Sequence, residues 1–327
     1  MTRLRQIVLG GLAALTMAGA ASSAFAMEAG TFQNRLNGAT IGIPAGAAAP
    51  PGVYSGLETA YLGMPGSGKG NQAPGLYLPA VAEAVPIVWS TGWNFLGANF
   101  SMVVVQAWYM GFITTGAPVY SGTFPATIGS FDVVANTFWS PINLSWNLGG
   151  GWFVSASFNF TAPDGSRYTG TPNPDYWTFE PAAAISYLSQ NWVASANFYY
   201  DINTVSSGPC CIRGAIGAGS ITSGNALYMD AFALYKIGKW ELGPVGYFEI
   251  QTTADTGPGC AVAGMCANLQ NYALGGLVGY DFGPVDIQVW VTDSVARQNA
   301  IDGVNFWTRI GFRVWAPEAP KPLVAKN

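Results

Sequence analysis

Residues 152–160 read WFVSASFNF, and this short stretch decides the fold class. Its apolar and polar side chains alternate. The apolar positions are Trp152, Val154, Ala156, Phe158 and Phe160, and the polar ones are Ser155, Ser157 and Asn159. A period of two is the mark of a β-strand whose two faces meet different surroundings. The stretch therefore predicts a strand with one apolar and one polar face.

The same alternation recurs along the chain, for example between Trp192 and Asp201 and again between Asn305 and Val314. We expect strands near residues 52–62, 76–89, 93–109, 127–146, 152–162, 176–188, 192–203, 223–236, 239–253, 268–282, 285–294 and 303–315. Most of these segments have about ten residues or more, enough for a tilted strand to cross a bilayer. The pattern continues without a linker, which indicates one domain.

Connection lengths between these segments alternate between short and long. The short ones fall at 90–92, 147–151, 189–191, 237–238 and 283–284. Outer-membrane barrels join antiparallel strands by short periplasmic turns and long external loops. The chain is therefore predicted to be an all-β protein, an antiparallel transmembrane β-barrel of about 12 strands over residues 52–315. Trp89, Trp93, Trp146, Trp152, Trp192, Trp240 and Trp315 lie beside short turns or the barrel's C-terminus, as an interfacial girdle would.

Composition favours a membrane protein over a soluble one. Only 9% of residues are charged while 14% are aromatic, whereas about a quarter of a soluble domain is charged. The chain has no charge between Glu83 and Asp132, so hydropathy alone would favour a helix over residues 95–116. Polar residues and glycines interrupt that stretch, and the other alternative, a secreted β-sandwich, does not explain the tryptophan positions.

Residues 1–26 have the parts of a secretory signal, with Arg3 and Arg5, an apolar core, and Ala24-Phe25-Ala26 before the expected cleavage site. We expect export by the Sec pathway to the outer membrane of a Gram-negative bacterium, where lipid and lipopolysaccharide surround the barrel. Residues 27–51 have no periodicity and fit either a periplasmic tail or a plug in the lumen. Residues 316–327 are expected to form a periplasmic tail.

Several functions are excluded or disfavoured. The net charge of −4 and the absence of a basic run argue against nucleic-acid binding. The chain has no histidine, the commonest general base and metal ligand, so no enzyme activity, metal or other cofactor is expected. The stretch 63–70 (GMPGSGKG) imitates a phosphate-binding loop but has Gly70 where Ser or Thr would hold Mg²⁺.

The four cysteines all lie in two long connections expected on the cell surface. They are Cys210, Cys211, Cys260 and Cys266. Export through an oxidising compartment favours disulfides. Pairing within the second loop and pairing between the loops both remain open.

Residues 175–203 (DYWTFEPAAAISYLSQNWVASANFYYDIN) resemble the central signature of the meta-pathway phenol degradation-like proteins. Further matches are PGVY at 51–54, APDGSRY at 162–168, SG at 223–224 before Asp230, and QTTADTG at 251–257. This family is similar to outer-membrane channels for hydrophobic compounds, so the resemblance implies uptake. The family often has His shortly before Asp230, where this chain has Tyr228-Met229.

The expected function is a channel or transporter for small hydrophobic compounds, aromatic ones included. The alternative is a structural or adhesive barrel whose lumen is closed, with Trp290 and Trp307 among the bulky inward residues. Charges on the lipid face cost several kcal/mol near the midplane, so polar residues of the strands should face the lumen. The predicted lumen residues are Ser157, Asn159, Glu180, Asn197, Asp201, Asp230, Glu249, Gln251, Asp286, Gln288, Arg309 and Arg313. The acidic ones are expected to face Arg309 and Arg313.

Overall fold

The computed structural model describes residues 33–64, 69–71, 80–115, 126–167, 173–206, 220–258, 268–298, 300 and 303–317. The predicted signal peptide, the four cysteines and most of the predicted C-terminal tail lie outside these residues, so those expectations stay predictions. Among the described residues no helix is long and apolar enough to span a membrane.

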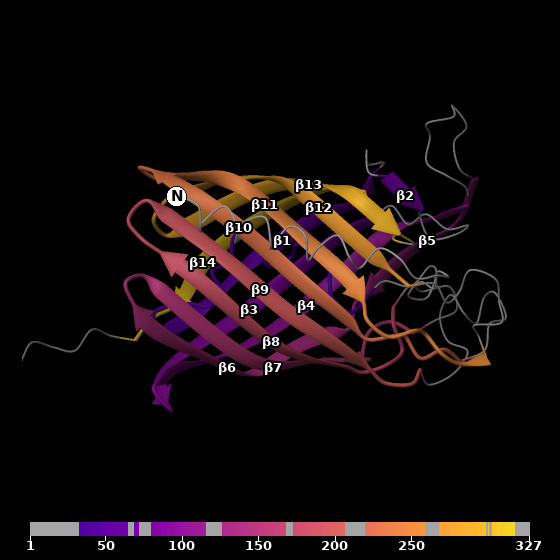
Figure 1. Cartoon of the computed structure of the whole chain (residues 1–327), viewed down its shortest axis with the longest axis horizontal. Helices are drawn as coiled ribbons and strands as arrows, with labels where there is room; N and C mark the ends of the chain where they lie inside the picture. The colour runs from indigo at the N-terminus through magenta and orange to yellow at the C-terminus, as the bar shows by residue number, and fades with distance from the viewer. Residues whose placement is uncertain are drawn as a thin grey trace, which may run out of the picture.

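The chain forms a closed antiparallel β-barrel (Figure 1). Its strands are β1 (Gly52–Met64), β3 (Ala80–Phe95), β4 (Ala98–Thr115), β5 (Ala126–Val134), β6 (Thr137–Gly149), β7 (Trp152–Ala162), β8 (Thr178–Leu188), β9 (Trp192–Asn203), β10 (Ala226–Ile237), β11 (Trp240–Gln251), β12 (Gln270–Asp281), β13 (Val285–Gln298) and β14 (Val304–Trp315). Adjacent strands pair, β4 pairs with both β5 and β6, and β1 pairs with β14 to close the sheet. The short β2 (Lys69–Asn71) adds to β13 in parallel. Because β5 and β6 are two parts of one crossing, the predicted 12-stranded barrel is confirmed.

The fourth crossing is broken, which corrects the single strand expected over 127–146. β5 and β6 are separated by Ala135 and Asn136. The Asn136 amide turns inward and donates to Asn34 Oδ1 at 2.9 Å and to the Pro174 carbonyl at 2.8 Å. The loop residue Ser166 donates its backbone N–H to the Val134 carbonyl at 2.9 Å, which satisfies the edge that β5 presents there.

The first short turn also differs from the expectation. It lies at Leu96–Gly97 rather than at 90–92, with φ values of 52° and 77°. Left-handed conformations at both central residues suit the twist of a two-residue hairpin. Gly92, which suggested the turn, has φ 75° and lies where the register of β3 against β4 shifts, between Ser90 and Asn94. It is therefore a bulge inside the hairpin.

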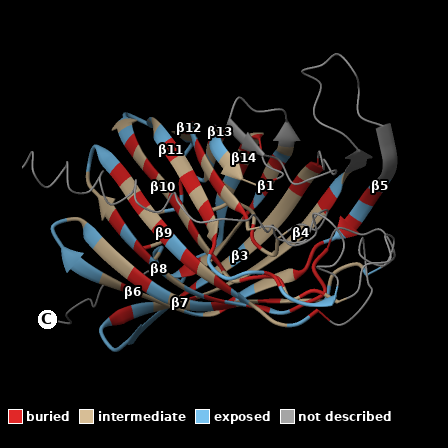
Figure 2. Cartoon of the chain, turned by 45° about the vertical axis from the view of Figure 1, so that its right-hand side comes forward, coloured by how far each residue is buried: buried red, intermediate tan, exposed pale blue. Residues whose placement is uncertain are grey.

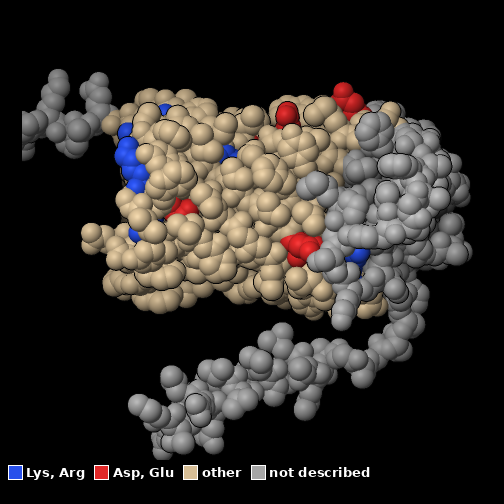
Figure 3. Space-filling view, turned by 90° about the horizontal axis from the view of Figure 1, so that it is seen from above, with Lys and Arg blue, Asp and Glu red and all other residues tan. Residues whose placement is uncertain are grey.

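The outer face of the barrel is an apolar belt with aromatic residues near its rims. Exposed apolar side chains of the belt include Leu57, Ile87, Ile142, Phe158, Ile185, Leu242, Leu274, Val278 and Ile310. Trp89, Trp93, Trp152, Trp192, Trp240 and Trp315 are between 39% and 60% exposed near the short turns. Figure 3 shows that the described surface is mostly uncharged. A closed barrel with this surface belongs in the outer membrane, because lipid covers the belt and the strands satisfy one another's backbone groups.

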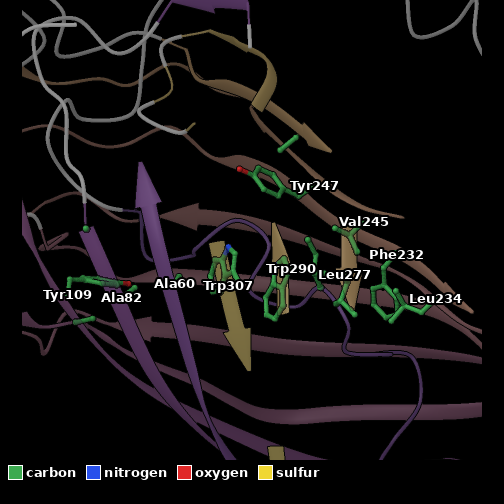
Figure 4. Packing of buried hydrophobic residues seen from close by; sticks show 14 of the residues in the cluster. Ala60, Ala82, Tyr109, Phe232, Leu234, Val245, Tyr247, Leu277, Trp290 and Trp307 are labelled. Carbon is green, nitrogen blue, oxygen red and sulfur yellow. The ribbon is translucent and has the colours of Figure 1, made fainter. Parts of the chain in front are cut away.

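Burial alternates along the strands, as the banding in Figure 2 shows. A cluster of inward apolar side chains includes Trp290, Trp307, Leu277, Val245, Phe232 and Leu234 (Figure 4). The rings of Trp290 and Trp307 stack with centroids 5.3 Å apart. Ile41, which precedes the first strand, is fully buried in the same cluster. Residues 33–50, called the lumen segment below, thus contribute to the packing of the barrel interior.

Candidate functional site in the lumen

The predicted lumen residues fall into three groups by exposure. Nine of them are buried: Asn159, Glu180, Asn197, Asp201, Asp230, Glu249, Gln251, Gln288 and Arg309. Ser157 is half-buried and lines an internal cavity. Asp286 and Arg313 are exposed. They share the strand faces of Gln288 and Arg309 but lie near the ends of their strands, where the lumen opens.

Asp230 and Glu180 bind the first part of the lumen segment. Arg35 lies 3.2 Å from Glu180 Oε2 and 3.5 Å from Asp230 Oδ2. Asp230 also accepts hydrogen bonds from the backbone N–H of Gly38 at 3.0 Å, and from the N–H and hydroxyl of Thr40 at 3.0 and 2.6 Å. One carboxylate therefore fixes the chain direction over three residues of the segment.

Arg309 binds the next part of the segment. Its guanidinium donates to the carbonyls of Ala39 and Ile41, both at 2.6 Å. It also donates to Glu58 Oε1 at 2.6 Å and to Gln288 Oε1 at 2.8 Å, and it lies 4.7 Å from the centre of the Trp290 ring. Gly42 follows directly with φ 81°, a left-handed conformation that favours glycine.

These contacts correct the expected pairing of charges. Glu180 and Asp230 pair with Arg35 rather than with Arg309 and Arg313, and Arg309 pairs with Glu58. The sequence reasoning missed both Glu58 and Arg35. Glu58 could have been found, because a charge inside a predicted strand should face the lumen. No periodic signal marked Arg35, since it precedes the strands.

Three other predicted residues bind different parts of the interior. Asn37 donates to Glu249 Oε2 at 2.6 Å. The Asn197 amide donates to the carbonyls of Thr40 and Ile43, both at 3.2 Å. Gln251 binds Asp255 and the N–H of Leu269 and so supports the loops at the end of β11.

The charged and amide residues of β8–β11, β13 and β14 that contact the lumen segment are called the polar wall: Glu180, Asn197, Asp230, Glu249, Gln288 and Arg309.

Serine hydroxyls bind the second part of the lumen segment. Ser145 Oγ donates to the Gly46 carbonyl at 2.7 Å and accepts from the Ala48 N–H at 3.0 Å. Ser155 donates to the Ala45 carbonyl at 2.8 Å, and Ser90 to the Ala49 carbonyl at 2.7 Å. All these contacts are neutral hydrogen bonds, which are weaker than the charge-assisted ones around Arg35 and Arg309.

A cavity of about 470 Å³ lies between the lumen segment and the strands on the other side of the barrel. Small and apolar inward side chains of β3 and β4 form one side, called the apolar wall: Ala82, Ala84, Pro86, Val88, Val103, Val105, Ala107 and Tyr109. Polar residues of β6 and β7, among them Asn143, Ser157 and Asn159, form another side. The cavity suits an apolar molecule with a small polar group.

Outside the strands, two loops pack against each other beyond β10 and β11. Thr222 and Thr256 pair as an isolated bridge, and the Gly224 N–H donates to Asp255 Oδ1 at 2.6 Å. Burial raises the pKa of Asp255 to about 7, although its hydrogen bonds with Gly224 and Gln251 act in the opposite direction. The stability of this contact therefore depends on pH between 3.8 and about 7.

The chain is similar to solved structures of outer-membrane proteins. The COG4313 outer membrane channel from Pseudomonas putida F1 has 11% sequence identity and a TM-score of 0.58, over 81% of this chain and 96% of that one. The β domain of the Bordetella autotransporter BrkA has 13% identity and a TM-score of 0.44, over 81% and 100%. At 11% identity, the likeness to the COG4313 channel shows the fold alone.

Sequence comparison identifies the family. No curated protein matches the chain significantly. Residues 63–310 match the family described as "Putative MetA-pathway of phenol degradation". The match extends from the end of β1 into β14 and so includes most of the barrel, which confirms the resemblance found in residues 175–203. The chain belongs to this family of outer-membrane barrel proteins.

Proposed function

We propose that the barrel is an outer-membrane channel or carrier for small hydrophobic compounds, aromatic ones included. The observation that carries this proposal is the cavity of about 470 Å³, bounded by the apolar wall inside a closed barrel. A pore for hydrophilic solutes would instead present charged or polar side chains along its whole length. The family description, which names phenol degradation, supports an aromatic or similarly apolar substrate.

The lumen segment supports a carrier more than an open pore. It lies between the polar wall and the cavity and is bonded to strands on several sides. A permeant molecule must therefore enter the cavity and leave it past movable groups. The neutral hydrogen bonds of residues 45–49 are weaker than the charge-assisted ones around Arg35 and Arg309. We therefore expect residues 45–49 to detach from the strands first.

Uptake by liposomes tests the proposal directly. Liposomes containing the refolded barrel should take up toluene and an alkane faster than protein-free liposomes, while a hydrophilic sugar should enter at the protein-free rate. A boiled and unfolded sample gives the control for lipid disturbance. Equal uptake of toluene with and without the barrel would refute the proposed function.

The second candidate is a structural or adhesive barrel with a closed lumen. The stacked Trp290 and Trp307 and the buried Ile41 of the lumen segment favour it, because they pack together inside the barrel. Planar-bilayer conductance and uptake separate the two: a closed structural barrel shows neither ion steps nor hydrocarbon entry. In both cases we infer that the protein is not an enzyme and that its contacts outside the lumen are with lipid and lipopolysaccharide.

A further inference from the structure

We propose that the cavity binds a long, unbranched hydrocarbon chain that lies along the apolar wall. This inference rests on the proposed function and names the substrate class by its shape. It depends on how the residues of the cavity lining are spaced along β3 and β4.

The cavity is long and follows the direction of the strands. Every second residue of β3 from Ala82 to Ser90 lines it, and so does every second residue of β4 from Ser101 to Tyr109. Side chains two positions apart share one face of a strand, so both series point into the lumen. At about 3.4 Å per residue, each series extends over roughly 27 Å. The cavity is therefore a slot along the wall of the barrel.

The slot is narrow for its length. Its volume of about 470 Å³, distributed over roughly 27 Å, leaves an average cross-section of about 17 Å². A cavity of ~150 Å³ is already large enough to bind benzene. The slot thus has room for about three such rings, and its shape places them end to end rather than side by side. A single ring would leave most of its length empty.

Small side chains form two long sides of the slot. The apolar wall presents mostly alanine and valine, and the lumen segment lines the cavity with the alanines at 45, 47, 48 and 49. A chain of methylene groups can contact both sides along its whole length. A branched chain of the same length would have to displace side chains or backbone, which is unfavourable in a packed interior. This surface therefore favours an unbranched chain.

The charged residues of the lining belong to ion pairs within the protein. Glu58 pairs with Arg309. Arg35 is surrounded by three carboxylates, those of Glu180, Asp201 and Asp230. None of these three described residues lines the cavity. A ligand along the apolar wall therefore meets uncharged side chains, which suits a hydrocarbon better than an ion.

Val105 is the residue that we expect to control the preference for shape. It lies at the midpoint of the lining series of β4, and its register partner Pro86 lies at the midpoint of the series of β3. A larger side chain at this position would divide the slot into two halves, each with room for one ring. A smaller side chain would widen the slot where a long chain must pass.

Competition between two hydrocarbons tests the inference. Hexadecane and pristane, a methyl-branched chain of nearly the same length, are added in equal amounts to lipid nanodiscs that contain the barrel. The hydrocarbon retained by the captured nanodiscs is measured by gas chromatography, and the amount in empty nanodiscs is subtracted. Because the branches of pristane press against packed walls, the barrel should retain roughly tenfold more hexadecane than pristane. Equal retention, or a preference for pristane, would overturn the inference.

Two substitutions at Val105 should act in opposite ways. Val105→Phe should lower the retention of hexadecane roughly tenfold but leave the retention of toluene near that of the wild type, because each half still holds one ring. Val105→Ala should raise the retention of pristane toward that of hexadecane. A folded Val105→Phe that retains hexadecane like the wild type contradicts the inference.

Val104→Phe is the matched control for these variants. Val104 lies between the exposed residues Ile87 and Trp139 in the sheet, so its side chain points toward lipid, and the added ring should change neither ratio. Heat-modifiable gel migration shows whether each variant is folded. If Val105→Phe does not fold, Val105→Ala and the wild-type ratio of hexadecane to pristane decide.

Liposome uptake separates failure of this inference from failure of the proposed function. If the barrel accelerates the uptake of toluene but retains hexadecane and pristane equally, the channel function stands and the inference about shape is wrong. If toluene enters no faster than into protein-free liposomes, the channel function is wrong, and the ratio of hexadecane to pristane still decides whether the slot selects an unbranched chain.

Discussion

The two sides of the lumen differ in what they bind. The polar wall uses carboxylates, amides and Arg309 to bind a segment of the chain itself, and Asp230 alone accepts from Gly38 and Thr40. The apolar wall on β3 and β4 presents mostly Ala and Val and bounds a cavity. The polar wall and the apolar wall belong to one continuous sheet. The difference in what they bind therefore comes from their inward side chains. One side is built for fixed structure, and the other leaves room for a ligand.

The largest effect is expected from Arg35→Ala. The substitution leaves Glu180 and Asp230 buried without their cation. The binding of the first part of the lumen segment to the barrel should therefore weaken by about 3–5 kcal/mol. Hydrogen exchange of residues 34–41 should become fast, and ion conductance should rise. The exposed Arg313→Ala is the matched control and should change neither. Unchanged exchange in Arg35→Ala would show that the polar wall does not depend on this charge.

The sequence predicted the strands of the barrel better than the contacts inside its lumen. β7 and β9 have the predicted bounds because alternation is a local property of a strand. The same alternation predicted the burial of Glu180, Asp230 and Glu249. The partners of these residues were not predictable in this way, because Arg35 approaches from a segment without a repeating pattern. The turn after β3 was misplaced because a glycine at positive φ serves a bulge as well as a turn.

An intermediate effect is expected on the apolar wall. Ala84→Phe places a ring in the cavity, where it takes space that a substrate would occupy, so toluene uptake should fall roughly tenfold, equivalent to ~1.4 kcal/mol of binding free energy. Ala84 lies opposite Glu58, which pairs with Arg309, so hydrogen exchange of residues 34–41 is measured beside uptake and should stay slow when the ring occupies only the cavity. Ala156→Phe on the exposed face of β7 adds the same ring toward lipid and should leave uptake unchanged. If Ala84→Phe transports like the wild type, the substrate path lies elsewhere.

A smaller effect is expected for the serine contacts. Ser145→Ala removes the bonds to the Gly46 carbonyl and the Ala48 N–H, a loss of about 1–2 kcal/mol for two neutral hydrogen bonds. Exchange at residues 45–49 should become faster while residues 34–41 stay protected, which would separate the two parts of the segment. Ser189→Ala, in an exposed turn, serves as the control. Equal loss of protection in both parts would mean that the segment is released as one unit.

The smallest effect concerns pH, and it arises outside the membrane, where Asp255 joins the two loops. Burial raises the pKa of Asp255 from 3.8 to about 7, so the folded contact favours the protonated carboxyl. The contact should therefore be most stable below pH 3.8, weaken as the pH rises toward 7, and stay at its lower stability above that value. After correction for the intrinsic rate, hydrogen exchange of Gly224 should indicate more frequent opening at pH 8 than at pH 5. Asp255→Asn, which is neutral throughout, should remove this difference, and Asp164→Asn in another loop should preserve it. A pH difference that persists in Asp255→Asn would assign the effect to a different group.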